Sequence, residues 1–218
     1  MRIHRRFAML VAALAAALTV GSVPAAADPA GGAVNFVLVQ TNIPGQTSVR
    51  ASTQITAIGA PTVAPVNAAT AINSDCAGCH TSAVAVQFVI VQSNPSVFAQ
   101  KNAAVAVNGG CDGCGAYAYA FQDIIQTDGP EHLSADAEQR VAQLRQQIAD
   151  AAASILPSDG LTDPCPVFPI DPTCPSRDAQ LDAKLNDLTG ELDSLIRADL
   201  HAGGPSAPNV QVQEAPGQ

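Results

Sequence analysis

The sequence predicts an α+β protein in which an N-terminal β-hairpin repeat module, built as a small sandwich or a short β-solenoid, precedes an antiparallel two-helix hairpin. Three observations lead to this prediction. A unit with a Cys-x-Gly-Cys motif occurs twice, 35 residues apart. Residues 29–127 carry very few charges and are rich in Ala and Val. Residues 128–201 are densely charged, with apolar residues every three or four positions.

The repeated unit aligns residues 67–87 with residues 102–122 without a gap. In each copy an alternating Ala-x-Ala-x-Asn run precedes the cysteines, and alternation of this kind is typical of a strand. A longer apolar run follows the cysteines. We therefore expect a strand, a tight Cys-x-Gly-Cys turn and a longer strand, with Gly78 and Gly113 providing the backbone freedom that the turn needs.

Other strands are predicted from Val- and Ile-rich runs that end in polar turn residues. Residues 33–42, 85–94 and 120–128 form three such runs, which are similar to one another. Residues 47–58 follow the Pro44-Gly45 turn and predict a further strand. The low aromatic content, with no Trp, implies a thin core of small and β-branched side chains that disulfides would reinforce.

The charged region predicts two helices, capped by Ser134 and Ser176. Their apolar residues recur at alternating spacings of three and four, which is the pattern of a narrow heptad seam. The seam residues are Val141, Leu144, Ile148, Ala151 and Ile155 in the first helix, and Leu181, Leu185, Leu188, Leu192 and Leu195 in the second. An antiparallel hairpin and a dimerising coiled coil, which would give self-association through the helices, both fit this pattern.

Within the second helix, Asp193 and Arg197 are four residues apart. Such a pair on a helix surface contributes only a few tenths of a kcal/mol, about 0.2–0.5. We therefore expect this pair to be a minor contact.

The N-terminus has the layout of a secretory signal peptide. A basic start is followed by an apolar run over residues 7–20 and by Ala25-Ala26-Ala27 before Asp28. An uncleaved anchor is the alternative, but the run is shorter than the ~20 residues of a spanning helix. Cleavage leaves seven basic and 19 acidic residues, a net charge of −12. This charge disfavours nucleic acid and anionic membranes as partners.

The predicted organisation has four parts. These are a signal peptide (1–27), the β-repeat module (28–127), a disulfide-pinned helical hairpin (128–202) and a disordered Pro/Gly/Gln-rich tail (203–218). We expect a secreted or cell-surface protein with no membrane span after cleavage.

All six cysteines follow the signal peptide, so in an exported protein we expect them to be oxidised. The simplest pairing is Cys76–Cys79, Cys111–Cys114 and Cys165–Cys174, although six cysteines allow 15 connectivities. If the repeats stack, a bridge such as Cys76–Cys111 is the main competitor, because adjacent strands lie about 4.8 Å apart.

Three other chemistries are compatible with the Cys-x-Gly-Cys motifs. Cys76, Cys79 and His80 match the c-type haem attachment motif, but the second copy has Gly115 in place of the His, and both Met residues lie in the signal peptide. Four thiols at this spacing could hold zinc, although export favours their oxidation. Thiol–disulfide exchange would need a Cys pair at a helix start, and neither copy has one.

No motif of a hydrolase accompanies these cysteines. His132 is interpreted as a solvated turn residue, and Tyr117 and Tyr119 as packing residues on one strand face. The sequence therefore favours a secreted, disulfide-stabilised structural or interaction protein without catalytic activity, cofactor or metal, whose partner is an unidentified protein or cell surface. The alternative is an exported redox or metal-binding protein that uses the Cys-x-Gly-Cys pairs.

The full repeat reads Asn-x-Ala-x-Ala-x-Asn-x-x-Cys-x-x-Cys-x-x-x-Ala-x-Ala-x-Gln. It resembles a repeat in uncharacterised secreted or surface proteins of actinobacteria, some of which carry the label of a peptide zinc metalloprotease. The resemblance covers residues 67–127 and implies an exported β-repeat module. The protease label does not transfer, because the sequence lacks the zinc-binding helix and membrane spans that the label requires.

Overall fold

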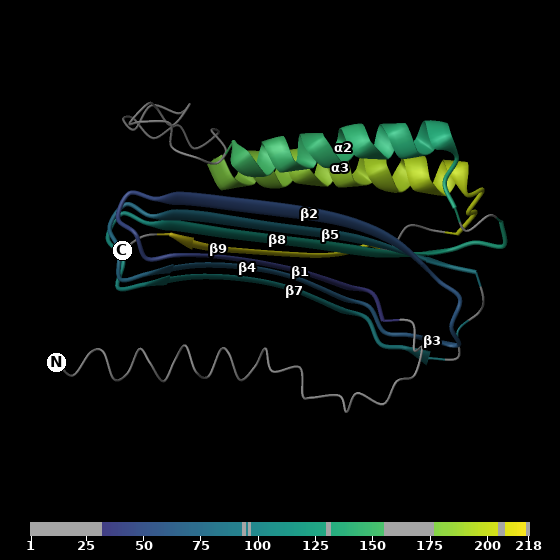
Figure 1. The fold of residues 1–218 in the computed structure, drawn as a ribbon, viewed down its shortest axis with the longest axis horizontal. Coiled ribbons are helices and arrows are strands. Elements are labelled where there is room, and N and C mark those ends of the chain that lie inside the picture. The colour runs from purple at the N-terminus through teal and green to yellow at the C-terminus, as the bar shows by residue number, and fades with distance from the viewer. Residues whose placement is uncertain are drawn as a thin grey trace.

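The structure is a computed structural model, and it describes residues 32–92, 95, 97–129, 132–154, 177–204 and 208–216. Within these ranges eight strands precede two helices, and a ninth strand follows them (Figure 1). The strands are β1 (Val34–Thr41), β2 (Thr47–Ile58), β3 (Thr62–Val63), β4 (Val66–Ser74), β5 (His80–Val91), β6 (Val97–Phe98), β7 (Lys101–Gly109), β8 (Gly115–Gln126) and β9 (Asn209–Pro216). The helices are α2 (Ala135–Ala153) and α3 (Arg177–Asp199).

The first eight strands are stacked in parallel. One sheet has the order β1-β4-β7, a second begins β2-β5-β8, and β3 pairs with β6. We call β1–β3, β4–β6 and β7–β8 the first, second and third rungs. Between the second and third rungs every paired residue lies 35 positions further along the chain, as in Asn67↔Asn102 and Gln87↔Gln122. The two larger sheets lie as layers one above the other (Figure 1).

The predicted fold class is therefore wrong. Strands make up 49% of the structure and lie in three sheets, so the fold is not built around a two-helix hairpin that follows a hairpin module. The Cys-x-Gly-Cys turn joins β4 to β5, but these strands belong to different sheets. A tight turn between alternating segments looks the same in sequence whether the strands pair with each other or face each other across a core. The hairpin interpretation failed because pairing with the next rung replaced pairing across the turn.

The space between the two sheets is filled mainly by alanine. The side chains that point inward from β4, β5, β7 and β8 are small, and two valines of β1 complete this cluster. Its members are Val37, Val39, Ala69, Ala71, Ala83, Ala85, Ala106, Ala116, Ala118 and Ala120. The alternating Ala-x-Ala pattern of the repeat thus gives the small inward faces that let the two layers approach closely.

Buried amide side chains form ladders along the stack. Asn67 is fully buried, and its Nδ2 lies 2.8 Å from Asn102 Oδ1, 3.1 Å from Ala85 O and 3.0 Å from Phe121 O. Asn35 on the first rung donates to Asn67 Oδ1 at 2.9 Å. These bonds satisfy polar groups that would be costly to bury alone. Equivalent contacts join Asn73 with Asn108, and Gln54, Gln87 and Gln122.

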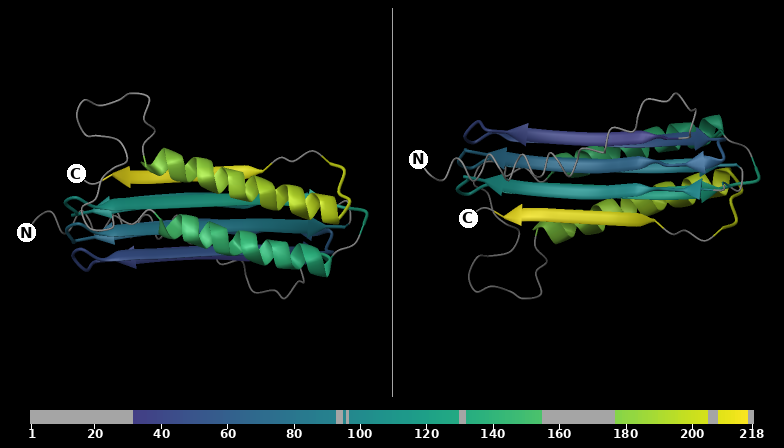
Figure 2. Two further views of the ribbon diagram at one scale, coloured as in Figure 1. Left: turned by 90° about the horizontal axis from the view of Figure 1, so that it is seen from above. Right: turned by 90° about the horizontal axis from the view of Figure 1, so that it is seen from below.

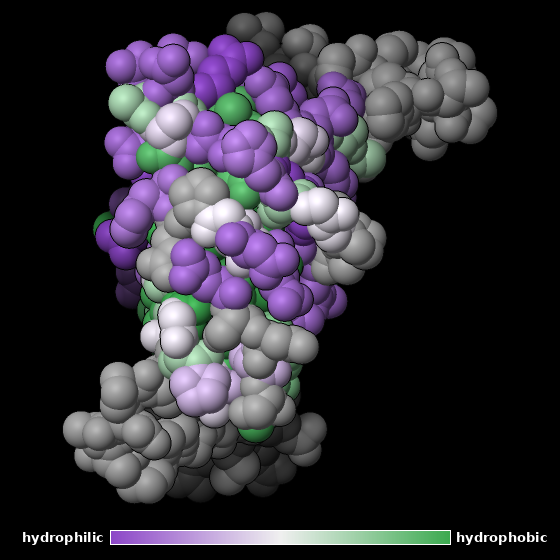
Figure 3. All heavy atoms as spheres, turned by 90° about the vertical axis from the view of Figure 1, so that its right-hand side faces the viewer, coloured by the Kyte–Doolittle hydropathy of each residue, from purple (hydrophilic) through white to green (hydrophobic). Residues whose placement is uncertain are grey.

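The two helices cover the outer face of the β2-β5-β8 layer (Figure 2). Ser134 caps α2 by accepting from the backbone nitrogen of Ala137, as predicted. The predicted seam residues that the structure describes are buried, with Leu144, Ile148, Leu185 and Leu192 fully enclosed, except that Leu195 is only partly buried. Ile155 of the first seam and Ser176, the predicted cap of the second helix, lie outside the described residues. The buried seam residues pack in one core cluster with large side chains of β5 and β8, including Val84, Phe88, Tyr119 and Phe121. Figure 3 shows that hydrophilic residues predominate over the helices at one end of the molecule.

Strand β9 corrects the prediction of a disordered tail over residues 203–218. It pairs antiparallel with β8, from Gly115↔Pro216 to Gln122↔Asn209. Asn102 donates to Asn209 O at 2.5 Å, and Asn108 donates to Ala215 O. The edge of the third rung therefore provides hydrogen-bond partners for β9. The polar composition of this segment alone did not predict a strand. Among the described residues, no helix combines the length and the hydropathy needed to cross a membrane.

Candidate tetracysteine site

The two Cys-x-Gly-Cys turns stack directly on each other. Gly78 and Gly113 have φ values of 64°, the left-handed region predicted for these glycines. Gly78 N donates to Asp112 O at 2.8 Å, and Gly115 N donates to Cys79 O at 2.9 Å. Backbone hydrogen bonds thus hold one turn over the other.

This stacking brings all four sulfurs together. The Cys76–Cys79 and Cys111–Cys114 pairs are at disulfide distance, with Cα separations of 6.2 and 5.8 Å. Between the rungs, Cys76 Sγ lies 3.3 Å from Cys111 Sγ and 3.9 Å from Cys114 Sγ. All four Sγ atoms lie within 4.8 Å of one another. The alternative Cys76–Cys111 disulfide is not formed, and these two sulfurs are in non-bonded contact. Cys165 and Cys174, the third predicted pair, lie outside the described residues.

The cluster is largely shielded from solvent. Cys76, Cys79 and Cys114 are buried, and Cys111 is partly exposed. The backbone nitrogen of Cys79 lies 3.3 Å from Cys114 Sγ, which gives the third-rung sulfur a donor from the second rung. Cys79 Sγ in turn lies 3.1 Å from Ile43 O of the first rung. The four cysteines Cys76, Cys79, Cys111 and Cys114, which we call the corner, therefore make contacts that involve all three rungs.

His80, the third residue of the haem-type motif, begins β5. It pairs in register with Gly115 on the third rung. A Cβ added to Gly115 would lie 3.0 Å from His80 Nδ1. The imidazole thus lies close to the Cα of Gly115, and a side chain at position 115 would require the imidazole to shift by a few tenths of an ångström.

A buried ionic cluster links β8 to α3, and the sequence analysis missed it. Arg197 Nη2 lies 2.5 Å from Asp123 Oδ2, and Arg197 Nε lies 2.8 Å from Asp193 Oδ1. Burial, reinforced by Asp193, raises the pKa of Asp123 to about 6 although Arg197 opposes this shift. The Asp193–Arg197 contact, which was expected to be minor, is therefore part of a buried triad. The available signal in the sequence was Asp123, the one charged residue of β8.

Tyr117 and Tyr119 are packing residues, as predicted. Both are buried under α3, where Tyr117 Oη donates to Asp182 Oδ1 at 2.6 Å and Tyr119 Oη donates to Asn186 Oδ1 at 2.9 Å. Burial raises the pKa of both hydroxyls, that of Tyr119 to about 12. For Tyr117 the hydrogen bond to Asp182 adds to the effect of burial. These bonds anchor α3 to the sheet.

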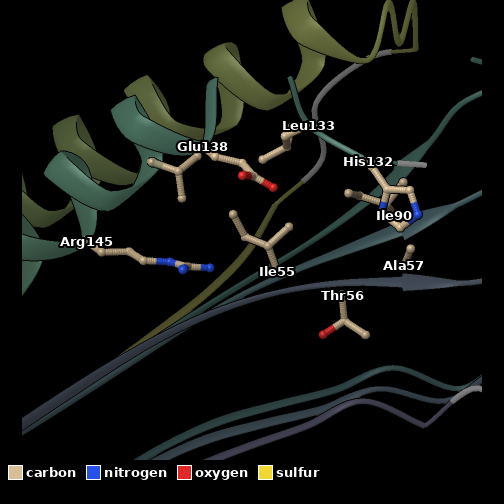
Figure 4. Close-up of a pocket in the computed structure, with 9 residues that line it drawn as sticks. Ile55, Thr56, Ala57, Ile90, His132, Leu133, Glu138 and Arg145 are labelled. Carbon is tan, nitrogen blue, oxygen red and sulfur yellow. The ribbon is translucent and has the colours of Figure 1, made fainter. Parts of the chain in front are cut away.

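A cleft of about 590 Å³ lies between α2 and the ends of β2 and β5 (Figure 4). Ile55, Ala57 and Ile90 line it from the sheet. His132, predicted to be a solvated turn residue, lines the same cleft. The remaining lining residues are Thr56, Leu133, Glu138, Val141 and Arg145. The floor of the cleft is largely apolar, and charged and polar side chains line its walls.

Comparison of the chain with protein-family models, curated proteins and solved structures found no match.

Proposed function

We propose that this protein is an exported structural or interaction protein without catalytic activity, in which disulfides reinforce a stack of parallel strands. The observation that supports this proposal best is the stacking of two Cys pairs at disulfide distance at one corner of the strand stack. The signal-like N-terminus and the even number of cysteines support export, because disulfides persist outside the cytosol.

The stabilising effect of these bridges can be worked out from the turn length. Closing a loop of about four residues removes about 2 kcal/mol of chain entropy from the unfolded state in the loop-entropy model. Two such bridges contribute about 4 kcal/mol, a large share of a typical domain's stability of about 5–15 kcal/mol. An Ala-filled interior buries little apolar area per residue. The disulfides thus compensate for the small hydrophobic contribution of this interior to the free energy of unfolding.

An exposed apolar row on β1 supports an interaction role. Val34, Phe36 and Leu38 point away from the Ala-filled interior and are 63%, 51% and 41% exposed. Adjacent exposed apolar side chains of this size commonly mark contact surfaces. The partner in this proposal is a protein or a cell surface, and the acidic chain disfavours nucleic acid.

Intact mass of the exported protein, before and after reduction and alkylation, tests the proposal. The expected result is a chain that begins at Asp28 and is about 6 mass units lighter than its reduced form, since each of three disulfides removes two hydrogens. Peptide mapping should assign the Cys76–Cys79 and Cys111–Cys114 bridges. Free thiols at these four positions in the exported protein would contradict the structural role.

A matched pair of variants tests the same role in folding. The Cys76→Ser/Cys79→Ser variant should lose about 2 kcal/mol in urea unfolding. His80→Ala, one residue away, should have a much smaller effect because it removes no bridge. An equal or larger loss in His80→Ala would show that His80, not the disulfide, stabilises this corner.

A further inference from the structure

The four sulfurs of the corner form a closed group contributed by two rungs. Cys76 and Cys79 come from the second rung, Cys111 and Cys114 from the third, and all Sγ atoms lie within 4.8 Å of one another. In a tetrahedral zinc site the Zn–S distance is about 2.3 Å, so neighbouring sulfurs lie about 3.8 Å apart. The Cys76 Sγ–Cys111 Sγ and Cys76 Sγ–Cys114 Sγ distances of 3.3 and 3.9 Å are already close to that value.

The backbone keeps this arrangement independently of the disulfides. Asp75 N donates to Gly109 O and Gly78 N to Asp112 O, each at 2.8 Å, and Ala77 forms a bridge with Asp112. These bonds hold the second-rung turn against the third-rung turn on either side of the sulfurs. After reduction the thiols can separate from about 2 Å to about 3.8 Å by side-chain rotation alone, because the Cα atoms stay fixed.

The surroundings suit thiolate ligands. Cys79 is fully buried and Cys114 nearly so, and Cys79 N, 3.3 Å from Cys114 Sγ, is placed to donate to a thiolate. Such donors stabilise the negative charge that sulfur carries when it binds a metal. Cys111 is the most accessible of the four, so an ion would enter on its side.

We propose that, in the thiol form, Cys76, Cys79, Cys111 and Cys114 bind one tetrahedral thiophilic cation of the Zn²⁺ type. Four thiolates favour zinc over hard, oxygen-seeking cations. Each disulfide takes up two electrons and two protons and gives two thiols. A dithiol supplies both and is itself oxidised to a disulfide, whereas a phosphine supplies the electrons and becomes a phosphine oxide while water supplies the protons and the oxygen. Binding of one Zn²⁺ then releases the four thiol protons. The metal form and the disulfide form are thus mutually exclusive states of one corner, and this inference goes beyond the structural role proposed above.

Cobalt titration of reduced protein tests the site. The protein carries Cys165→Ser and Cys174→Ser, so that the four corner cysteines are the only thiols, and is reduced with a phosphine without oxygen. Each chain should bind one Co²⁺ ion. The complex should show the sulfur-to-cobalt charge-transfer band and the visible bands of a tetrahedral thiolate site. One equivalent of Zn²⁺ should abolish these bands and release one Co²⁺. Absence of the bands, or a stoichiometry other than one, would overturn the proposal.

Variants establish which atoms bind. Cys79→Ser and Cys111→Ser should each weaken Co²⁺ binding at least tenfold, because each removes one of four ligands. Cys111 is partly exposed, so its variant keeps the fold more readily than that of the fully buried Cys79, and far-UV circular dichroism checks both. His80→Ala is the matched control and should leave the spectrum unchanged. Loss of the site in His80→Ala, or its retention in folded Cys111→Ser, would refute four-sulfur ligation. Disulfide mapping of the oxidised export product tests the structural role separately.

Discussion

Replacing Arg197 with Met removes the one cation of a buried charge cluster while keeping most of the side-chain volume. Arg197 bonds Asp123 on β8 at 2.5 Å and Asp193 on its own helix at 2.8 Å. The three side chains are 12%, 1% and 9% exposed. Arg140 offers a matched control on α2, because it pairs with Glu191 at 2.8 Å but both side chains are about half exposed, at 53% and 47%.

The two substitutions should differ strongly in their cost. Removing one partner of a buried ion pair costs about 3–5 kcal/mol, because the remaining charge stays out of water without compensation. Here two carboxylates, Asp123 and Asp193, would remain. An exposed pair contributes about 0–1 kcal/mol. We therefore expect Arg197→Met to lower the free energy of unfolding by about 3–5 kcal/mol at neutral pH, and Arg140→Met by at most about 1 kcal/mol.

Urea unfolding of the oxidised protein, followed by far-UV circular dichroism, measures both losses. The triple variant Arg197→Met/Asp123→Asn/Asp193→Asn should recover more than half of the stability lost in Arg197→Met, since it removes the uncompensated charges. If Arg197→Met costs no more than Arg140→Met, the cluster does not hold α3 on the sheet. If the triple variant recovers nothing, the loss reflects packing of the Arg197 stem and not charge.

Three further predictions concern single positions. The pKa of Asp123 is raised from 3.8 to about 6, so the folded state binds the carboxyl proton more tightly than the unfolded state does. The stability that this proton adds is present below the unfolded pKa and is lost as pH rises through about 6. The difference in unfolding free energy between the wild type and Asp123→Asn should therefore shift against the wild type by up to about 3 kcal/mol from pH ~4 to ~7, and a flat difference would refute the shifted pKa. Gly113→Ala, at φ 64°, should cost about 1 kcal/mol, whereas Gly190→Ala within α3, also with open space around it, should stabilise by up to about 1 kcal/mol; equal effects in urea unfolding would contradict the role of the turn conformation. Ser134→Ala should lower thermal stability by about 1–2 kcal/mol, because it removes the cap of α2 and the bond to Asp199, and an unchanged melting temperature would show that the cap contributes little.

Much of the local structure could be predicted from the sequence. Residues 47–58 were predicted as a strand and form β2 with the same bounds. The cap at Ser134, the left-handed Gly78 and Gly113 and the apolar seams of both helices, as far as the structure describes them and apart from the partly buried Leu195, were also predicted correctly. A helix cap, a turn conformation and the apolar face of a helix depend on neighbours within about four residues, so spacing and residue type are sufficient to identify them.

The partners of the strands could not be predicted in the same way. Alternating Ala-x-Ala runs and a Gly-containing turn are compatible both with a hairpin and with strands stacked on the next copy of the unit. The choice depends on contacts 35 residues apart, such as the Asn67–Asn102 bond. The tail containing β9 was missed for a related reason, since its partner is the edge of β8, which exists only once the third rung has formed.

The sequence by itself determined that two Cys-x-Gly-Cys turns of equal length would form, because each copy carries the same glycine and the same flanking alternation. Only the tertiary structure decided that the four sulfurs share one corner and that Asp123 meets Arg197 from another element. Parallel stacking superimposes equivalent residues of successive copies, and this turned two separate motifs into one four-sulfur group. Packing of α3 on β8 likewise turned an apparent surface pair into a buried charge cluster, since burial is a property of the assembled layers and not of sequence spacing.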